Sequence, residues 1–397
     1  MDAVGIEILP SSAEIIRVRE SLVRTDKQRV AAGMDKFSKK RSWENAGKSV
    51  PFPHVRITRG AFPEEAERLL GRYLYEVERI KDNTFRQVLR FAAMCILESI
   101  SFTRKDGQYL RWDSRSGRRA GGKPFNKGPI PAFTEAISAK LVQIARDLAG
   151  ESDLFGTLPR TVNEGSVSLL VGSCLDILPT LRTSSFDGIV TSPPYCNRYD
   201  YTRTYALELA MLGVDEQGFR DLRQSLLTCT VENRAKSGLE NRFPKPIFEQ
   251  AVAAFDSQEL LGHILEYLDA CRENGSLNNT GIPRMVRNYF LEMTLVIAEC
   301  ARVLKPGAPL VMVNDNVRYQ GANISVDLVM SALAERVGYD VEVIWVLPRG
   351  KGNSSQQMGE HGREELRKCV YVWRSKGQPA SQPARRLASV RSGLQPV

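Results

Sequence analysis

The stretch Phe186-Asp187-Gly188-Ile189-Val190-Thr191-Ser192-Pro193-Pro194-Tyr195 decides how the rest of the chain is interpreted. Its apolar run, within residues 186–190, predicts a buried strand. The two prolines end that strand, because proline has no N–H to donate to a sheet. Each proline also keeps its predecessor out of the helical region, so residues 192–194 should be stiff and extended. Their carbonyls are then free to accept hydrogen bonds from a ligand.

The residue types of this stretch suit one kind of ligand. A hydroxyl at Ser192, rigid carbonyls and an aromatic ring at Tyr195 fit a planar base that carries an exocyclic amino group. The alternative is an ordinary Pro-Pro turn with a surface tyrosine. The strand before the loop and the context after it favour the functional interpretation.

Composition limits the classes of protein to which the chain can belong. Its 397 residues suffice for two domains or for one large domain with an insertion. The net charge of +9 favours a polyanionic partner, although many basic proteins bind nothing acidic. Seven dispersed cysteines, without a Cys-x-x-Cys pair, argue against disulfides and structural zinc. With neither a signal peptide nor a membrane span evident, we expect a cytoplasmic protein.

Apolar strands alternate with amphipathic helices in this chain, and the last two strands form a predicted antiparallel pair. This order predicts an α/β fold with a doubly wound sheet. Ligands of such sheets bind beyond the carboxyl ends of the strands. The predicted strands span residues 3–8, 167–171, 186–190, 310–313, 341–347 and 369–373, and the predicted helices 11–22, 63–101, 132–148, 202–212, 285–304 and 326–337.

Charge and periodicity divide the chain into four parts. Residues 1–23 begin the sheet, and residues 24–150 form a basic and helical insertion. Residues 151–374 hold the rest of the sheet, with a further helical insertion at about 214–282, and residues 375–397 form a basic tail that we expect to be disordered. The segments 24–59 and 102–127 are rich in Lys and Arg, and the second interleaves them with aromatic residues. Each is either a nucleic-acid contact or an ordinary solvated linker or hairpin.

Thr191-Ser192-Pro193-Pro194-Tyr195 resembles the catalytic loop of the DNA amino-methyltransferases, which use S-adenosylmethionine to methylate exocyclic amino groups. The serine in first position resembles the cytosine-N(4) branch, whereas the adenine-N(6) branch more often has aspartate or asparagine there. The resemblance covers most of residues 167–374 and implies a Rossmann-like sheet with helical insertions. Further similar positions are Asn197, Asp200-Tyr201, Leu207-Glu208, residues 303–307 and Asn314-Asp315.

The resemblance implies catalytic roles for Ser192, Pro193, Pro194 and Tyr195. Hydrogen bonds from the amino group to Ser192 and to the Pro193 carbonyl would localise the nitrogen lone pair. The carbonyl dipoles would then stabilise the positive charge that develops on the nitrogen. The substrate would be double-stranded DNA with the target base flipped out, and Tyr195 would stack on that base. No covalent enzyme intermediate is needed, so Cys196 is not expected to act as a nucleophile.

Four residues are predicted to bind the cofactor, S-adenosylmethionine. Glu7 follows the first strand, where a doubly wound enzyme places the acid that holds ribose hydroxyls. Ser173 and Asp176 resemble the segment that borders the adenine ring, although Asp176 could equally be a helix cap. Thr191 adjoins the catalytic loop and completes the set. No metal site is expected.

One part of the family pattern is not found. The first strand and its Phe-x-Gly-x-Gly loop, which wraps the methionine end of the cofactor, should precede Glu7, but only six residues do. Residues 349–353 are basic, follow the wrong kind of strand and are a poor substitute. We therefore expect a sheet that lacks its first strand. A misassigned start, a partner chain that supplies the loop, or a decayed remnant would each explain the pattern.

These observations predict a cytosine-N(4)-specific DNA methyltransferase of a restriction–modification system. The alternatives are an adenine-N(6) methyltransferase that acts on DNA or RNA, and a non-catalytic DNA-binding subunit. The target sequence depends on which side chains reach base edges and is not encoded in any motif of the chain.

Overall fold

The computed structural model describes residues 1–377, except residue 24 and residues 107–108, 119–123, 151–164 and 349–365. The chain forms two compact units, and each is described by itself. Unit 1 consists of Met1–Cys174 and Asn197–Arg234, and unit 2 consists of Leu175–Cys196 and Ala235–Val397. The predicted strands fall in both units, with the first two in unit 1 and the others in unit 2.

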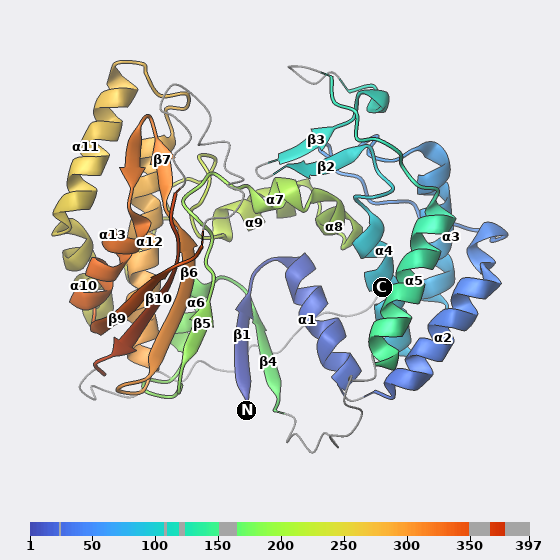
Figure 1. Ribbon diagram of the computed structural model, residues 1–397, viewed down its shortest axis with the longest axis horizontal. Helices are drawn as coiled ribbons and strands as arrows, with labels where there is room; N and C mark the ends of the chain where they lie inside the picture. Colours follow the sequence, from blue (N-terminus) through green and yellow to red (C-terminus); the bar gives the residue numbers. More distant parts are fainter. Residues whose placement is uncertain (24, 107–108, 119–123, 151–164, 349–365, 378–397) are drawn as a thin grey trace. The chain divides into compact units, whose positions relative to one another are not determined.

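Unit 1 is mainly helical and contains a parallel strand pair, β1–β4, and an antiparallel hairpin, β2–β3 (Figure 1). Its strands are β1 (Ala3–Glu7), β2 (Thr103–Asp106), β3 (Tyr109–Trp112) and β4 (Val167–Val171). Its helices are α1 (Pro10–Val23), α2 (Lys27–Lys40), α3 (Glu64–Glu78), α4 (Asn83–Ile96), α5 (Phe133–Ala149), α7 (Tyr201–Thr204), α8 (Ala206–Met211) and α9 (Glu216–Ser225), with 3-10 turns η1 (Ser42–Glu44) and η2 (Ser114–Ser116).

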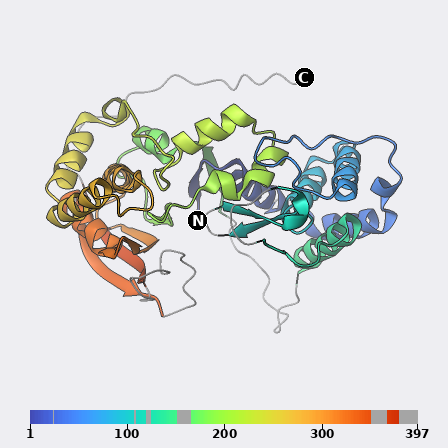
Figure 2. The same ribbon diagram turned by 90° about the horizontal axis from the view of Figure 1, so that it is seen from above.

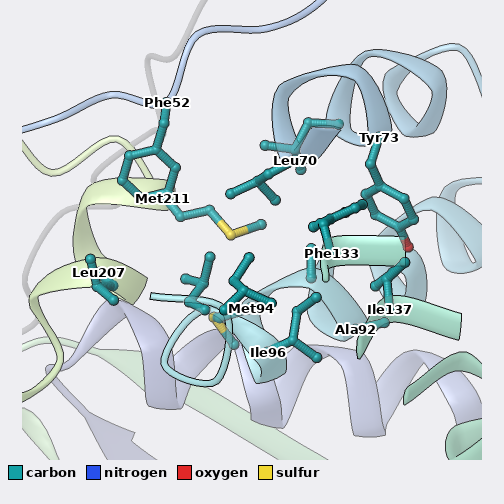
Figure 3. Close-up of a cluster of buried hydrophobic side chains, with 14 of the residues drawn as sticks. Phe52, Leu70, Tyr73, Ala92, Met94, Ile96, Phe133, Ile137, Leu207 and Met211 are labelled. Carbon is teal, nitrogen blue, oxygen red and sulfur yellow. The ribbon is translucent and has the colours of Figure 1, made fainter. Parts of the chain in front are cut away.

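An apolar core fills the helical part of unit 1, and Figure 3 shows side chains from α3, α4, α5 and α8 within it. Tyr73 is fully buried there, and its hydroxyl donates to the Leu89 carbonyl at 2.9 Å, so its burial leaves no polar group unpaired. Helix α2 adds Met34 to the same core. Residues 27–40 are therefore a packed helix, and the linker interpretation of this part is wrong.

Unit 2 contains a four-stranded sheet in the order β5-β6-β10-β9, in which β5 and β6 are parallel and the other pairs antiparallel. Helix α13 packs on β6, β9 and β10, and α12 packs on α13 (Figure 1, Figure 2). The strands are β5 (Ile189–Thr191), β6 (Pro309–Asp315), β7 (Val317–Tyr319), β8 (Ala322–Ile324), β9 (Tyr339–Val346) and β10 (Lys368–Ser375). The helices are α6 (Cys174–Ile177), α10 (Lys245–Asp256), α11 (Glu259–Glu273), α12 (Ile282–Val303) and α13 (Val326–Arg336), with 3-10 turns η3 (Leu178–Thr180) and η4 (Leu239–Asn241).

Three elements differ from the sequence-based expectation. Strand β5 is shorter than residues 186–190, because the chain bends at Asp187 and Phe186 makes only an isolated bridge with Leu304. The predicted helix 202–212 is two short helices, α7 and α8, which are separated at Tyr205. The hairpin β7–β8 was not predicted. The final antiparallel pair β9–β10 is confirmed, and β1–β4 and β5–β6 are parallel pairs, but these two parallel pairs belong to separate sheets rather than to the one doubly wound sheet that was expected.

A buried arginine fixes the segment that leads into β5. Arg302 on α12 pairs with Glu299 one turn earlier, with 2.6 Å between Arg302 Nη2 and Glu299 Oε2. The same guanidinium donates to the Leu178 carbonyl at 2.9 Å and to the Thr183 hydroxyl at 3.0 Å. Arg302 thus links residues 178–183 to α12 and fixes the path by which the chain enters β5.

Arg302→Met is expected to destabilise unit 2 by about 3–5 kcal/mol, because it leaves the Glu299 carboxylate buried without its partner. Burial already raises the pKa of Glu299. The loss should therefore shrink as the pH falls, since protonation removes the unpaired charge. Urea unfolding at several pH values measures both effects. A loss below 1 kcal/mol at neutral pH, or one that grows in acid, would contradict this role of Arg302.

Candidate active site

The loop 192–195 follows β5 directly, as the prolines predicted. Ser192 is exposed, Pro193 is buried, and Pro194 and Tyr195 are half-buried. The Ser192 Oγ and Tyr195 Oη atoms lie 3.3 Å apart, within hydrogen-bond distance. The loop therefore presents a hydroxyl to solvent with the tyrosine phenol beside it, on a backbone that two prolines keep stiff.

A buried tyrosine fixes the far end of this loop. Tyr319, in the β7–β8 hairpin, donates its hydroxyl to the Cys196 carbonyl at 2.6 Å. Cys196 is fully buried, so its thiol has no access to a substrate. This burial agrees with the expectation that Cys196 is not a nucleophile. The loop 192–195 is thus held between a strand at its start and the Tyr319 hydrogen bond at its end.

The carboxyl end of β6 adjoins the carboxyl end of β5, because Thr191 pairs with Met312. Asn314 is fully buried there, and its side-chain oxygen accepts from the Asp315 N–H at 2.8 Å. Burial raises the pKa of Asp315, while Lys368, whose Nζ lies 3.5 Å from Asp315 Oδ2, acts in the opposite direction. Polar groups from both strands therefore lie at the carboxyl ends of two adjacent parallel strands, where ligands of parallel sheets commonly bind.

Unit 1 brings together the cofactor candidates Glu7 and Ser173. Strands β1 and β4 end side by side, and the Gly172 N–H donates to the Glu7 carbonyl at 3.0 Å. The Glu7 carboxylate accepts from the Ile8 and Leu9 N–H groups, both at 2.8 Å and both on Oε1. Ser173 is buried just beyond β4. The turn after β1 therefore holds Glu7 in one orientation through a single carboxylate oxygen.

The other two cofactor candidates, Asp176 and Thr191, lie in unit 2. Asp176 is the third residue of α6 rather than its N-cap, so the helix-cap alternative is wrong. Its carboxylate pairs with Arg242 at 3.2 Å. Thr191 is the last residue of β5 and directly precedes Ser192. The four candidates thus form two pairs, one in each unit.

Sequence reasoning missed the residues that support the loop. Tyr319 and Arg302 contact it or its approach, and Tyr289 accepts a hydrogen bond from the Asn314 side chain at 2.7 Å. None of the three belongs to a motif. Their roles depend on contacts between segments more than 20 residues apart in sequence, which periodicity does not show.

The segment 102–127 was predicted to be either a nucleic-acid contact or an ordinary hairpin. Two of its arginines, Arg115 and Arg118, interact with other groups of unit 1. Arg115 makes a two-pronged pair with Asp113, at 2.8 Å for both contacts. Arg118 stacks over Trp112 at 3.8 Å and donates to carbonyls of residues 56–59. These contacts account for the alternation of basic and aromatic residues without a ligand. Two further cations of this segment, Arg119 and Lys123, lie outside the described residues, as do the predicted basic loop 349–353 and the tail from residue 378.

Among the residues that the structure describes, no helix combines the length and the apolar character needed to cross a membrane. The same residues contain no group of three or more His, Cys, Asp or Glu side chains arranged to hold a metal ion.

Comparison with known proteins identifies close relatives. No protein-family model matches the chain, and no solved structure matches it significantly. The chain is 50% identical over 379 residues to the type II methyltransferase M.AvaI of Nostoc sp. strain PCC 7120 and, equally, to M.AvaI of Anabaena variabilis. Each match covers 94% of this chain and 76% of the relative.

A more distant relative agrees with these two. The type II methyltransferase M.BsoBI of Geobacillus stearothermophilus is 38% identical over 408 aligned residues, which cover 94% of this chain and 75% of the relative. Identity of this level over nearly the whole chain leaves no doubt about kinship. The chain therefore belongs to the type II methyltransferases, the S-adenosylmethionine-dependent DNA methyltransferases of restriction–modification systems.

Proposed function

We propose that this chain methylates the exocyclic amino nitrogen, N(4), of cytosine in double-stranded DNA. The observation that carries the proposal is the loop after β5, where Ser192 is exposed beside Tyr195 on a proline-stiffened backbone. Family membership supplies DNA as the substrate. Ser192 in first position supports cytosine as the target base.

The loop acts on the acceptor side of the reaction. The Ser192 hydroxyl and the Pro193 carbonyl accept the two amino hydrogens and turn the nitrogen lone pair away from conjugation with the ring. The nitrogen then forms a bond to the transferred methyl group as the carbon–sulfur bond breaks, and one amino proton leaves to solvent. Tyr195 holds the flipped base by stacking. Because the loop is fixed at both ends, positioning contributes much of the rate.

The donor side fits S-adenosylmethionine, which supplies an electrophilic methyl group when bound. The Glu7 Oε1 atom is engaged by its own turn, and no described residue bonds to Oε2, so that oxygen is the natural acceptor for ribose hydroxyls. Ser173 lies beside Glu7 in unit 1, and Asp176 and Thr191 are the cofactor candidates of unit 2.

DNA recognition falls to the two insertions, residues 24–150 and about 214–282. Support comes from exposed lysines on and near α2 that pair with no described residue: Lys27, Lys36, Lys40 and Lys48. Free cations of this kind neutralise phosphates and give binding a strong dependence on salt.

The methylated base is the first test. Double-stranded DNA treated with this chain and S-adenosylmethionine, with and without the part of M.AvaI that the match leaves out, is digested to nucleosides. Mass spectrometry should show N(4)-methylcytosine. N(6)-methyladenine instead would contradict the choice of base, and no methylated nucleoside in either mixture would favour the non-catalytic subunit.

Ser192→Ala should lower kcat about 100-fold with DNA affinity unchanged, because it removes one acceptor that acts on the reacting nitrogen.

Tyr195→Ala should weaken base capture by about 1–3 kcal/mol through lost stacking. Tyr195→Phe keeps the ring and is the matched control. Equal losses in Tyr195→Phe and Tyr195→Ala would show that stacking is not what Tyr195 provides.

Tyr319→Phe removes only the hydroxyl that donates to the Cys196 carbonyl. We expect a loss of about 1 kcal/mol in unfolding free energy. We also expect kcat to fall several-fold while KM for DNA stays constant, because a loosened loop misplaces the amino group. A loss of stability without a change in kcat would assign Tyr319 a purely structural role.

A further inference from the structure

Residues 55–60 of unit 1 form a tight turn whose backbone is fixed by its own hydrogen bonds. The Val55 carbonyl accepts from the N–H groups of Thr58 and Arg59, at 2.9 and 3.1 Å. Thr58 is fully buried, and its hydroxyl accepts from the Val55 N–H at 3.0 Å and donates to the Val55 carbonyl at 3.1 Å. Gly60 ends the turn with a φ of +70°, in the left-handed region that favours glycine. The path of this backbone is therefore set before any ligand binds.

Arg118 fixes the same turn from a second segment of unit 1. Its guanidinium donates to the carbonyls of Arg56, Ile57 and Arg59, at 2.8, 3.2 and 2.7 Å. The guanidinium also stacks over Trp112, with 3.8 Å between its Cζ atom and the ring centroid. The planar fork of an arginine holds the acceptors that it bridges in one geometry. Arg118 therefore clamps the turn to the hairpin β2–β3.

Two arginine side chains on this turn are available to a ligand. Arg56 and Arg59 are both exposed, and neither guanidinium pairs with a residue that the structure describes. Arg118 occupies the carbonyl oxygens of the turn that could otherwise accept from these side chains. The Glu216 carboxylate accepts from the Arg56 backbone N–H and not from its guanidinium. One arginine thus holds the turn, and two others project from it without a partner.

The rigidity of the turn decides which part of DNA these arginines suit. Contacts with phosphates tolerate mobile side chains, because they carry no sequence information, and the exposed lysines on and near α2 are of that kind. Contacts with base edges require donors that are held in a fixed position. In the major groove guanine presents its O6 and N7 acceptors side by side, and this pair matches the fork of an arginine. Guanidinium groups on a clamped turn therefore fit guanine better than the backbone.

We propose that Arg56 and Arg59 determine sequence specificity by reading guanine in the major groove of the target DNA. Each guanidinium would donate to both O6 and N7 of one guanine. Because one tight turn carries both arginines, the two guanines would lie within a few base pairs of each other. The inference rests on the proposed function for DNA as the ligand, and it assigns part of target recognition to the insertion 24–150.

Selection from random DNA tests this inference without any methylation step. The full chain is mixed with double-stranded DNA of random sequence, and the bound molecules are recovered and sequenced for the parent, Arg56→Lys and Arg59→Lys. Lysine keeps the positive charge but lacks the fork. We expect the parent to select a site with guanine at fixed positions. Each variant should lose roughly 10-fold of the preference for guanine at one of these positions and keep its preference at the others. Both side chains are exposed, so the variants should melt at the temperature of the parent.

A modified base identifies the atom that is contacted. The base 7-deazaguanine lacks the N7 acceptor and is placed at the position where Arg59→Lys loses its preference. It should weaken binding of the parent roughly 10-fold and binding of Arg59→Lys much less, because the variant no longer makes this contact. Equal weakening of the two proteins would contradict an arginine contact at N7.

The matched control is Arg79→Lys, at the end of helix α3, where the exposed Arg79 pairs with Glu76 at 3.1 Å. This variant should select the same site as the parent. A parent chain that selects no sequence would overturn the inference. Unchanged selection by Arg56→Lys and Arg59→Lys would also overturn it and would mark both arginines as phosphate contacts. A chain that selects guanine as expected but yields no methylated nucleoside would refute the proposed function and leave this inference intact.

Discussion

The parallel pairing of β5 with β6 is the interaction on which the rest of unit 2 depends. It involves only three residues of β5, yet it sets where the Ser-Pro-Pro-Tyr loop begins. A strand this short makes few hydrogen bonds with β6, so other contacts must hold it in place. Arg302 fixes the approach to β5, and Tyr319 fixes the exit of the loop through the Cys196 carbonyl. The Ser192 hydroxyl keeps a fixed position only because the buried groups of Arg302 and Tyr319 have hydrogen-bond partners.

The positions of the loop and of Glu7 at strand ends were easier to predict than the contacts that support the loop. Consecutive prolines after an apolar run leave little choice but a strand end, and Glu7 followed from the strand before it. The length of β5 was overestimated, although Asp187-Gly188 is a dipeptide typical of bends. The role of Tyr319 could not be predicted, because it depends on a contact with Cys196, 123 residues away in the sequence.

The charge of a segment did not show which of its cations are free to bind a ligand. The basic and aromatic segment 102–127 looked like a nucleic-acid surface, but Arg115 and Arg118 bind partners within unit 1. An arginine that donates to carbonyls and stacks on its own tryptophan is less available for a phosphate. Composition records how many cations a segment has and not how many remain unpaired. The free lysines of α2 are the better candidates for DNA contact.

The loop after β5 can act on a base only if it is held at both ends, and hydrogen exchange tests this most directly. Amide exchange at Tyr195, Cys196 and Asn197 is measured in the parent chain and in Tyr319→Phe. We expect these amides to exchange slowly in the parent and faster in the variant, because the variant lacks the hydrogen bond to the Cys196 carbonyl, while β9 stays unchanged. Equal exchange at these amides in the two proteins, or an equal increase along β9, would contradict the role of Tyr319 in holding the loop.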